Sequence, residues 1–330
     1  MLTGRRRRII ACVASLYVVA QALGPGRAGG DSRRLSAGVC ITGQLCRLSL
    51  SNKHGNFFRL ALEEFNMFTT FALQDSSTCS FTNTRNARYT EQFEEMRNLE
   101  DWMQAHSLPY IIRTIPNTEP TIQWRYVYAL NKLGRVNETE RAIHHWRQWR
   151  SYQICAEEFK KQPEMDIYFR MRDDGLFVRP FSPSHLVQNH KQSRRNSGVL
   201  LLRRSVSHVY VSACARWHGV SDKIAIFFDK SSALHVLMNT ARIYEERYNE
   251  LTCPRKGHCK YTFQATNPET FLLQAWRYLN VKIDVIDPLS LPYATGTDTG
   301  VGFCFTDFTR QLGECVQIYQ VVYKNDMRTC

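Results

Sequence analysis

Two adjacent carboxylates flanked by arginines follow an apolar run in residues 165–181, MDIYFRMRDDGLFVRPF. The side chains over Ile167–Met171 alternate between two faces, which is typical of a β-strand. Arg170, Arg172 and Asp174 share one parity of that pattern. The sequence therefore predicts a short strand whose end carries a carboxylate beside two guanidinium groups.

Such a strand end suits a divalent cation together with a bound phosphate. Mg²⁺ and Mn²⁺ prefer hard oxygen ligands and often take one or two carboxylates, with substrate phosphates at other positions. An arginine fork matches two phosphate oxygens at once. The same residue types would also form a surface ion-pair cluster, which contributes little to stability. The motif alone leaves both interpretations open.

Strands and amphipathic helices alternate along the chain, which predicts an α/β fold with a mostly parallel central sheet flanked by helices. In such an open sheet, ligands bind outside the carboxyl ends of the strands. Strands are expected at residues 38–45, 65–73, 110–115, 167–171, 198–202, 209–215, 223–228 and 281–286. Helices are expected at residues 56–65, 90–106, 141–161, 232–251 and from Pro268 onward, with Asn267 as the N-cap.

A second candidate site follows the first expected strand. Thr42, Gly43 and Gln44 lie at the end of that run, where a glycine turn is expected, and Arg47 comes shortly afterwards. The turn matches neither GxGxxG nor GxxxxGK[ST], which excludes the usual dinucleotide-binding and P-loop interpretations. The chain also lacks a GxSxG elbow and an HExxH motif.

The order of these motifs resembles a family of glycosyltransferase-like proteins from algae, protists and plants. The motifs that carry the resemblance are VCITGQLCRL, HHWRQWRSYQICAEEF, DIYFRMRDD, WHGVSDKIAIF and NPETFLLQAWRYLNVKI. The chain is similar, more distantly, to the WavE-type lipopolysaccharide core glycosyltransferases. This resemblance covers roughly residues 38–290. It implies a GT-A-like fold in a single domain and transfer of a sugar from a nucleotide sugar.

The resemblance also implies roles for individual residues. Asp174 takes the metal-binding position, with Mn²⁺ or Mg²⁺ as cofactor, although this chain reads RDD instead of DxD. Asp222 and Glu269 become candidate catalytic carboxylates on the acceptor side. Asp222 would otherwise be a solvated residue before a strand, and a glutamate like Glu269 favours a helix N-terminus in any protein. The residues expected to bind the nucleotide sugar are Thr42, Gly43, Arg47, Arg170, Arg172 and Asp173.

These features favour a metal-dependent glycosyltransferase that acts on a glycan, protein or lipid acceptor. The cation, Arg170 and Arg172 would stabilise the charge that gathers on the departing nucleoside diphosphate. An inverting route needs a carboxylate base and a retaining route does not, and both stay open. The alternatives are a lumenal sulfotransferase and a non-catalytic carbohydrate-binding protein on a degenerate transferase fold.

The first 34 residues differ from the rest. Four arginines at 5–8 precede an apolar stretch at 9–24, which is the layout of a secretory signal peptide or a short signal anchor. The stretch is slightly shorter than the roughly 17–25 residues that span a bilayer, so cleavage and membrane anchoring both stay open. We expect the transferase domain at 35–292 and a C-terminal extension at 293–330 to be lumenal, in the Golgi or the endoplasmic reticulum, or secreted.

The charge distribution argues against a nucleic-acid partner. The formal net charge is +13, but seven arginines and a single aspartate fall in the first 34 residues. The remaining charge is spread along the chain without a basic and aromatic stripe. A mildly positive protein suits an anionic sugar nucleotide. One sequon, at Asn137, predicts an N-linked glycan.

Cysteine usage agrees with an oxidising compartment. Ten of the eleven cysteines follow the targeting segment, and an even number is consistent with disulfides. Cys253 and Cys259 bracket a PRKGH loop and are the favoured pair. A zinc site through these two and His258 lacks an evident fourth ligand. Three other cysteines lie in apolar runs, where small buried residues are the alternative to disulfides: Cys40, Cys155 and Cys214.

We expect a disulfide between Cys253 and Cys259, because two residues this close in a loop with Pro and Gly can approach within bridging distance. Peptide mapping without reduction should recover the two residues in one linked species. Correctly folded protein that yields both as free thiols would contradict the prediction.

Overall fold

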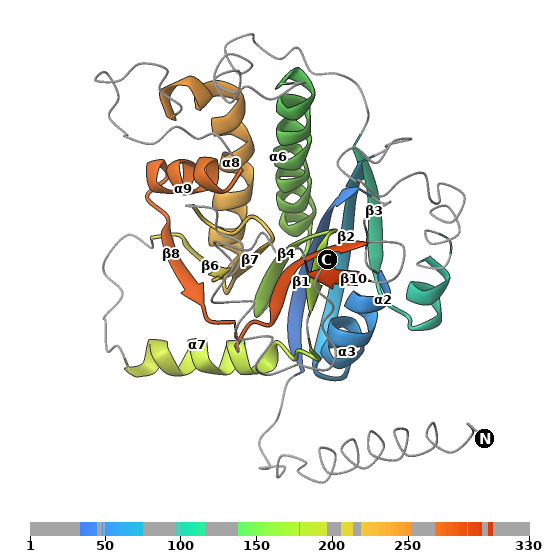
Figure 1. Cartoon of the computed structure of the whole chain (residues 1–330). Helices are drawn as coiled ribbons and strands as arrows, with labels where there is room; N and C mark the ends of the chain where they lie inside the picture. The colour runs from blue at the N-terminus through green and yellow to red at the C-terminus, as the bar shows by residue number, and fades with distance from the viewer. Residues whose placement is uncertain are drawn as a thin grey trace, which may run out of the picture. The chain divides into compact units, whose positions relative to one another are not determined.

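The computed structural model describes the following residues of the chain: 34–44, 48, 50–74, 97, 100–115, 138–177, 179–196, 206–213, 219–251, 268–288, 290–298 and 303–305 (Figure 1). Leu35–Cys330 make up one compact unit. Within the described ranges, no helix has both the length and the apolarity that crossing a membrane requires. The predictions for residues 9–24, Arg47, Asn137 and the Cys253–Cys259 pair concern residues outside these ranges and stay predictions.

A seven-stranded sheet in the order β3-β2-β1-β4-β7-β6-β8 forms the centre of this unit. Every pairing is parallel except those of β7, which runs antiparallel to both β4 and β6. The structure therefore confirms the α/β fold with a mostly parallel sheet. The strand bounds are β1 Leu35–Gln44, β2 Phe65–Gln74, β3 Tyr110–Ile115, β4 Ile167–Arg172, β6 His208–Ser212, β7 Ile224–Phe227 and β8 Lys282–Ile286.

Helices cover both faces of this sheet (Figure 1). One face packs against α6 (Glu138–Lys161), α8 (Lys230–Leu251) and α9 (Pro268–Tyr278). The other face packs against a continuous helical stretch and against α7 (Ser184–Asn196). That stretch consists of α2 (Leu50–Lys53), the π-helical turn η2 (His54–Phe58) and α3 (Arg59–Glu64).

Strand β4 confirms the alternation expected from the sequence. Ile167, Phe169 and Met171 belong to the core on the α3 and α7 side, whereas Tyr168 belongs to the core beneath α6 and α8. Both faces of the strand are buried, as is usual for a strand inside a parallel sheet. Arg170 lies on the same face of the strand as Tyr168, so its charged side chain enters the interior and needs partners there.

Most of the expected elements are present with shifted ends. The helix expected at 56–65 begins earlier, at Leu50, and ends at Glu64, where β2 takes over. The strand expected at 209–215 is shorter and starts at His208. Of the helix expected at 90–106, residues 97 and 100–105 are described and helical. The strand expected at 198–202 lies outside the described residues.

A small second sheet in the order β10-β9-β5 was not anticipated from the sequence. Strand β5 (Gly175–Phe177) follows β4 directly and pairs antiparallel with β9 (Tyr293–Asp298), which pairs with β10 (Phe303–Phe305). A three-residue strand shows no measurable periodicity. The segment after Pro292 thereby returns to the strand that follows the Arg-Asp-Asp motif.

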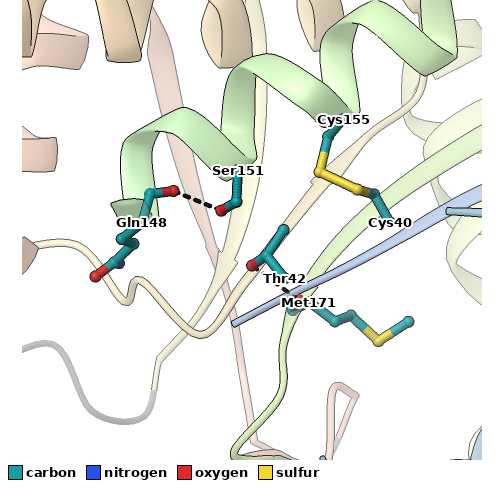
Figure 2. Close-up of a disulfide and its surroundings, with 6 residues drawn as sticks. All are labelled: Cys40, Thr42, Gln148, Ser151, Cys155 and Met171. Atoms are coloured by element: carbon teal, nitrogen blue, oxygen red, sulfur yellow. Dashed lines mark hydrogen bonds between the residues drawn. A yellow bond between two sulfur atoms is a disulfide. The ribbon is translucent and has the colours of Figure 1, made fainter. Parts of the chain in front are cut away.

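A disulfide joins β1 to α6 through Cys40 and Cys155 (Figure 2). Of the two alternatives for these cysteines, the disulfide is the one found, because they are buried and also bonded to each other. They are 115 residues apart in sequence, and pairing over such a distance cannot be deduced from cysteine positions. The bond fixes one face of α6 to β1, an inner strand of the sheet.

We expect the double substitution Cys40→Ala and Cys155→Ala to lower the free energy of unfolding by about 4–5 kcal/mol. The reason is that the cross-link closes a long loop and restricts the unfolded chain. Denaturant titration of the variant against the oxidised wild type measures the loss. Reduced wild-type protein should unfold like the variant. Wild-type protein in which both thiols alkylate under denaturing, non-reducing conditions would contradict the bond itself.

Candidate functional site

Three segments meet at the carboxyl edge of the sheet. Strand β1 ends at Gln44 and β4 ends at Arg172, and the reversed strand β7 brings the segment before Ile224 to the same edge. The amide of Arg172 donates to the carbonyl of Lys223 over 2.8 Å, and the amide of Asp173 donates to the carbonyl of Thr42 over 2.8 Å. The two segments singled out in the sequence, at Thr42 and at Arg172, are therefore neighbours. Residues 219–223 lie beside them at the same edge.

Arg172 lies at the centre of the charged groups on this edge. Its Nη1 binds Oδ2 of Asp222 over 2.5 Å, and its Nη2 binds Oδ2 of Asp174 over 2.7 Å. Burial acts to lower the pKa of Arg172, but Asp174 and Asp222 outweigh burial and raise this pKa well above its usual value. One guanidinium thus holds two carboxylates from different parts of the chain.

Asp222 is fully buried and anchors these groups. Besides Arg172, its carboxylate accepts a hydrogen bond from Nε2 of Gln148 over 2.8 Å and lies 3.0 Å from Nζ of Lys223. Burial would raise the pKa of Asp222, but the attraction of Arg172 and Lys223 overcomes it and lowers the pKa well below its usual value. Asp222 is therefore a weak proton acceptor at neutral pH.

Arg170 points into the interior from the same strand as Arg172. It donates through Nη1 to the backbone carbonyl of Asp222, and its guanidinium stacks 4.2 Å from the ring centroid of Tyr152. A cation over an aromatic face is stabilised by the ring quadrupole, more so when it is desolvated. Arg170 therefore supports the Asp222 segment from inside the fold and does not reach solvent.

Helix α6 supplies two of these partners from one face. Gln148, Tyr152 and Cys155 are spaced by four and then three residues, so they share a helix face. The Cys40–Cys155 bond holds this face against β1, close to Thr42 and Met171 (Figure 2). Sequence analysis missed Gln148 and Tyr152, although a glutamine in line with a buried tyrosine and cysteine is a recognisable signal.

Asp173, the first aspartate of the Asp-Asp pair, is buried and bonded to the end of β1. Asp173 is 0% exposed, and its Oδ2 accepts the amide hydrogen bond of Gln44 over 2.7 Å. Gly43 has φ of +137°, and a Cβ at this residue would lie 2.1 Å from Cγ of Asp173. Thr42 donates through Oγ1 to the carbonyl of Met171 over 3.3 Å (Figure 2). Thr42, Gly43 and Asp173 thus join the ends of β1 and β4 through buried contacts.

Asp174 is the aspartate of this pair that reaches solvent, with 14% of its side chain exposed. Among the described residues, no group of three or more His, Cys, Asp or Glu side chains could hold a metal ion. Mg²⁺ and its analogues often bind through one or two carboxylates, with substrate phosphates and water completing the shell. Asp174 fits such a substrate-completed site, and an all-protein cage does not fit here.

Glu269 lies in the first turn of α9 and is almost fully buried. Its carbonyl accepts the amide hydrogen bond of Val220 over 3.1 Å, and a Cβ on Gly219 would lie 2.1 Å from that carbonyl oxygen. Burial, followed by the negative charge of Asp222, raises the pKa of Glu269 to about 8. Glu269 and Asp222 are neighbouring carboxyl groups whose pKa values are shifted in opposite directions. Such a difference lets one group stay protonated while the other stays ionised.

Lys53 completes the site from the opposite face of the sheet and was missed by sequence analysis. Its side chain is 0% exposed, and burial lowers the pKa of its ammonium to about 8. Its Nζ donates to the carbonyls of Asp173 and Gly175, both over 2.7 Å. Lys53 falls in line with the buried Phe57 and Ala61 at intervals of four residues. A lysine on an apolar helix face is the signal that was available.

The chain matches no protein-family model and no curated protein sequence. A glycosyltransferase involved in the glycosylation of the major capsid of PBCV-1 is 12% identical over 77% of this chain and 84% of its own, with TM-score 0.30. A mannosyltransferase from Pyrobaculum calidifontis, in complex with GDP-Man and Mn²⁺, is 10% identical over 69% and 59%, with TM-score 0.27. A CMP:2-keto-3-deoxy-manno-octonic acid synthetase complexed with CTP is 10% identical over 88% and 100%, with TM-score 0.36. Likenesses with TM-scores this low assign no function to the chain.

We expect Glu269→Gln to stabilise the protein increasingly as pH rises from 5 to 8. The folded state keeps the proton on Glu269 up to a pH of about 8, whereas an unperturbed glutamate releases it near 4.5. The unfolded chain therefore binds fewer protons in this window, and the wild-type free energy of unfolding falls with pH. The slope for one proton is at most about 1.4 kcal/mol per pH unit.

Denaturant titrations of wild type and Glu269→Gln at several pH values measure this difference. Glu246→Gln, at an exposed carboxylate of α8, is the matched control and should show a much flatter difference. A difference between Glu269→Gln and wild type that stays constant from pH 5 to 8 would show that Glu269 ionises normally.

Proposed function

We propose that this chain is a metal-dependent glycosyltransferase with a GT-A-like fold, which moves a sugar from a nucleotide sugar to a glycan, protein or lipid acceptor. One observation carries the proposal. The guanidinium of Arg172 binds Asp174 on one side and Asp222 on the other, at the carboxyl edge of a mostly parallel sheet. This edge is where open α/β sheets bind their ligands.

The donor diphosphate would contact Arg172 and Lys223. Both side chains are partly exposed, whereas Arg170 is buried behind them. Negative charge gathers on the diphosphate as the bond to the sugar breaks, and cations that are already fixed in place stabilise that charge without reorganising. Asp222 fixes both cations, because its carboxylate contacts Arg172 and Lys223 together.

Asp174 would hold the divalent cation, Mn²⁺ or Mg²⁺. A cation bound there would neutralise charge on the departing diphosphate. Asp173 is buried against Gly43, so its carboxylate does not reach the solvent-facing position where Asp174 would bind the cation. The protein would therefore offer one carboxylate, and Arg172 would keep that carboxylate oriented toward the edge of the sheet.

Glu269 is the better candidate for a base at the acceptor hydroxyl in an inverting displacement. Burial raises its pKa to about 8, so its deprotonated form is the minority species at neutral pH but accepts a proton more readily than the carboxylate of Asp222 does. Asp222 has a pKa well below the usual value, mainly through Arg172 acting against burial, and is a poor base. We therefore assign Asp222 the positioning of Arg172 and Lys223.

The proposal also includes the lumen of the secretory pathway as the location of the domain. The signal-like composition of the first 34 residues supports it. The Cys40–Cys155 bond supports it as well, because disulfides persist mainly in oxidising compartments.

A thermal-shift screen of nucleotide sugars with and without Mn²⁺ tests the function. A ligand that binds only the folded state stabilises it by about 2.7 kcal/mol at a hundredfold excess over its Kd. We expect one nucleotide sugar to raise the melting temperature only when Mn²⁺ is present. Stabilisation by a phosphosulfate donor instead would favour the sulfotransferase, and stabilisation by neither would favour the binding protein.

In the same assay, Asp174→Asn should fold normally and lose the Mn²⁺-dependent shift in melting temperature. In a separate assay of sugar transfer, its rate should fall by ~10²-fold or more, the scale seen when a main electrostatic stabiliser is removed. Asp166→Asn is the control, because Asp166 lies at the opposite end of β4 and binds Ser36. The assignment fails if Asp174→Asn binds nucleotide sugar with unchanged Mn²⁺ dependence.

A further inference from the structure

Lys53 is a charged side chain in the core that the proposed reaction does not use. It is 0% exposed and belongs to α2, on the side of the sheet away from α6. Both of its hydrogen-bond acceptors are backbone carbonyls, those of Asp173 and Gly175. These two carbonyls come from the residues immediately before and after Asp174.

We infer that Lys53 is a positioning residue that sets the place of Asp174 by binding the backbone on both sides of it. The inference rests on the proposed function only for the identity of the ion that Asp174 would hold. The fixed geometry itself is independent of that ion.

The backbone around Asp174 needs such support because it leaves the large sheet. After Arg172 the chain turns at Asp173 and Asp174 and enters β5. One edge of β5 pairs with β9. The other edge faces α2 and η2, where a helix offers no strand to pair with.

Side chains of α2 and η2 take the place of a neighbouring strand along that edge. Nδ2 of Asn52 and Nδ2 of Asn56 both donate to the carbonyl of Phe177 over 3.0 Å, and the amide of Phe177 donates back to Oδ1 of Asn52 over 2.8 Å. Lys53 continues this row to Gly175 and Asp173. Three side chains within little more than one helical turn therefore attach the helix to the chain that carries Asp174.

A lysine is suited to this position for a chemical reason. Its ammonium has three donors on one atom at the end of a long stem, so Lys53 reaches two carbonyls at once from an apolar helix face. Hydrogen bonds from an ionised donor are shorter and stronger than neutral ones. Two such bonds at 2.7 Å restrain the residues immediately before and after Asp174.

Two substitutions separate positioning from simple packing. Lys53→Met keeps the apolar stem and fits the helix face beside Phe57 and Ala61, but it removes every donor. Lys53→Gln is less apolar and one bond shorter, but it keeps N–H donors at the end of the side chain. If Lys53 only fills space, Met should be the milder change in every measurement. If Lys53 positions Asp174, Lys53→Gln should be the milder change in two measurements: hydrogen exchange of the turn and the Kd for Mn²⁺.

The matched control is Lys230→Met. Lys230 also binds two backbone carbonyls through Nζ, those of Lys160 and Gln162, but it does so far from Asp174, at the carboxyl end of α6. This variant loses the same kind of contact without touching the turn.

The first measurement is hydrogen–deuterium exchange of the amides from Asp173 to Phe177 in the full chain. We expect exchange there to be about tenfold faster in Lys53→Met than in wild type, as for a segment whose local opening has become easier. Lys53→Gln should be intermediate, and Lys230→Met should match wild type. Equal exchange in all four proteins overturns the inference, whether or not the protein binds a metal.

The second measurement is the Kd for Mn²⁺ alone, from the electron paramagnetic resonance signal of the free ion. We expect Lys53→Met to raise this Kd about tenfold, the usual scale when support of a ligand is removed, with Lys53→Gln between it and wild type. In an Asp174→Asn background, Lys53→Met should add nothing further.

The outcomes distinguish this inference from the proposed function. Faster exchange in Lys53→Met, with a wild type that binds no Mn²⁺ alone and shows no Mn²⁺-dependent stabilisation by any nucleotide sugar, would sustain the positioning role and count against the metal-dependent reaction. A Lys53→Met effect on Mn²⁺ that persists in full with Asp174→Asn would overturn the inference, because Lys53 would not act through Asp174. If Lys53→Met does not fold, exchange in Lys53→Gln against Lys230→Met decides.

Discussion

The buried ion pair between Arg172 and Asp222 is the interaction on which the rest of this structure depends. Removing either partner would leave an uncompensated charge inside the protein, which is far more costly than losing a surface pair. The surrounding elements are arranged to prevent that. Helix α6 brings Gln148 to the same carboxylate, the segment before β7 brings Lys223, and Arg170 holds the Asp222 backbone from below.

This pair also explains the electrostatic character of the sheet edge. Among the described residues around this edge, the basic groups Lys53, Arg170, Arg172 and Lys223 outnumber the aspartates Asp173, Asp174 and Asp222. Glu269 adds no negative charge at physiological pH, since burial raises its pKa to about 8, so the excess of positive charge is kept. An edge of this kind is suited to a ligand with several negative charges, such as a diphosphate. The same partners that keep the buried charges stable therefore create the binding character of the edge.

Much of the framework could be predicted from the sequence, because it follows from local periodicity. The alternation over β4 placed Arg170 and Arg172 on one face, and the Asn-Pro start of α9 placed Glu269 in a first helical turn. Contacts between distant segments could not be predicted in this way. The Cys40–Cys155 bond, the donors of Lys53 and the pairing of β5 with β9 depend on tertiary arrangement. Helix α7 was missed because its sequence is polar and begins without an acidic residue in its first turn.

The tail of the chain has a mechanical connection to this edge. Tyr293, the first residue of β9, donates through its hydroxyl to the carbonyl of Arg172 over 3.1 Å, across 121 residues of sequence. A Cβ on Gly175 would lie 1.9 Å from that hydroxyl oxygen, so the two segments are in the closest contact that a glycine permits. A displacement of residues 293–298 would therefore be transmitted through β5 to Asp174. Residues 293–298 therefore help to fix the geometry of the sheet edge, although they follow Arg172 by more than a hundred residues in sequence.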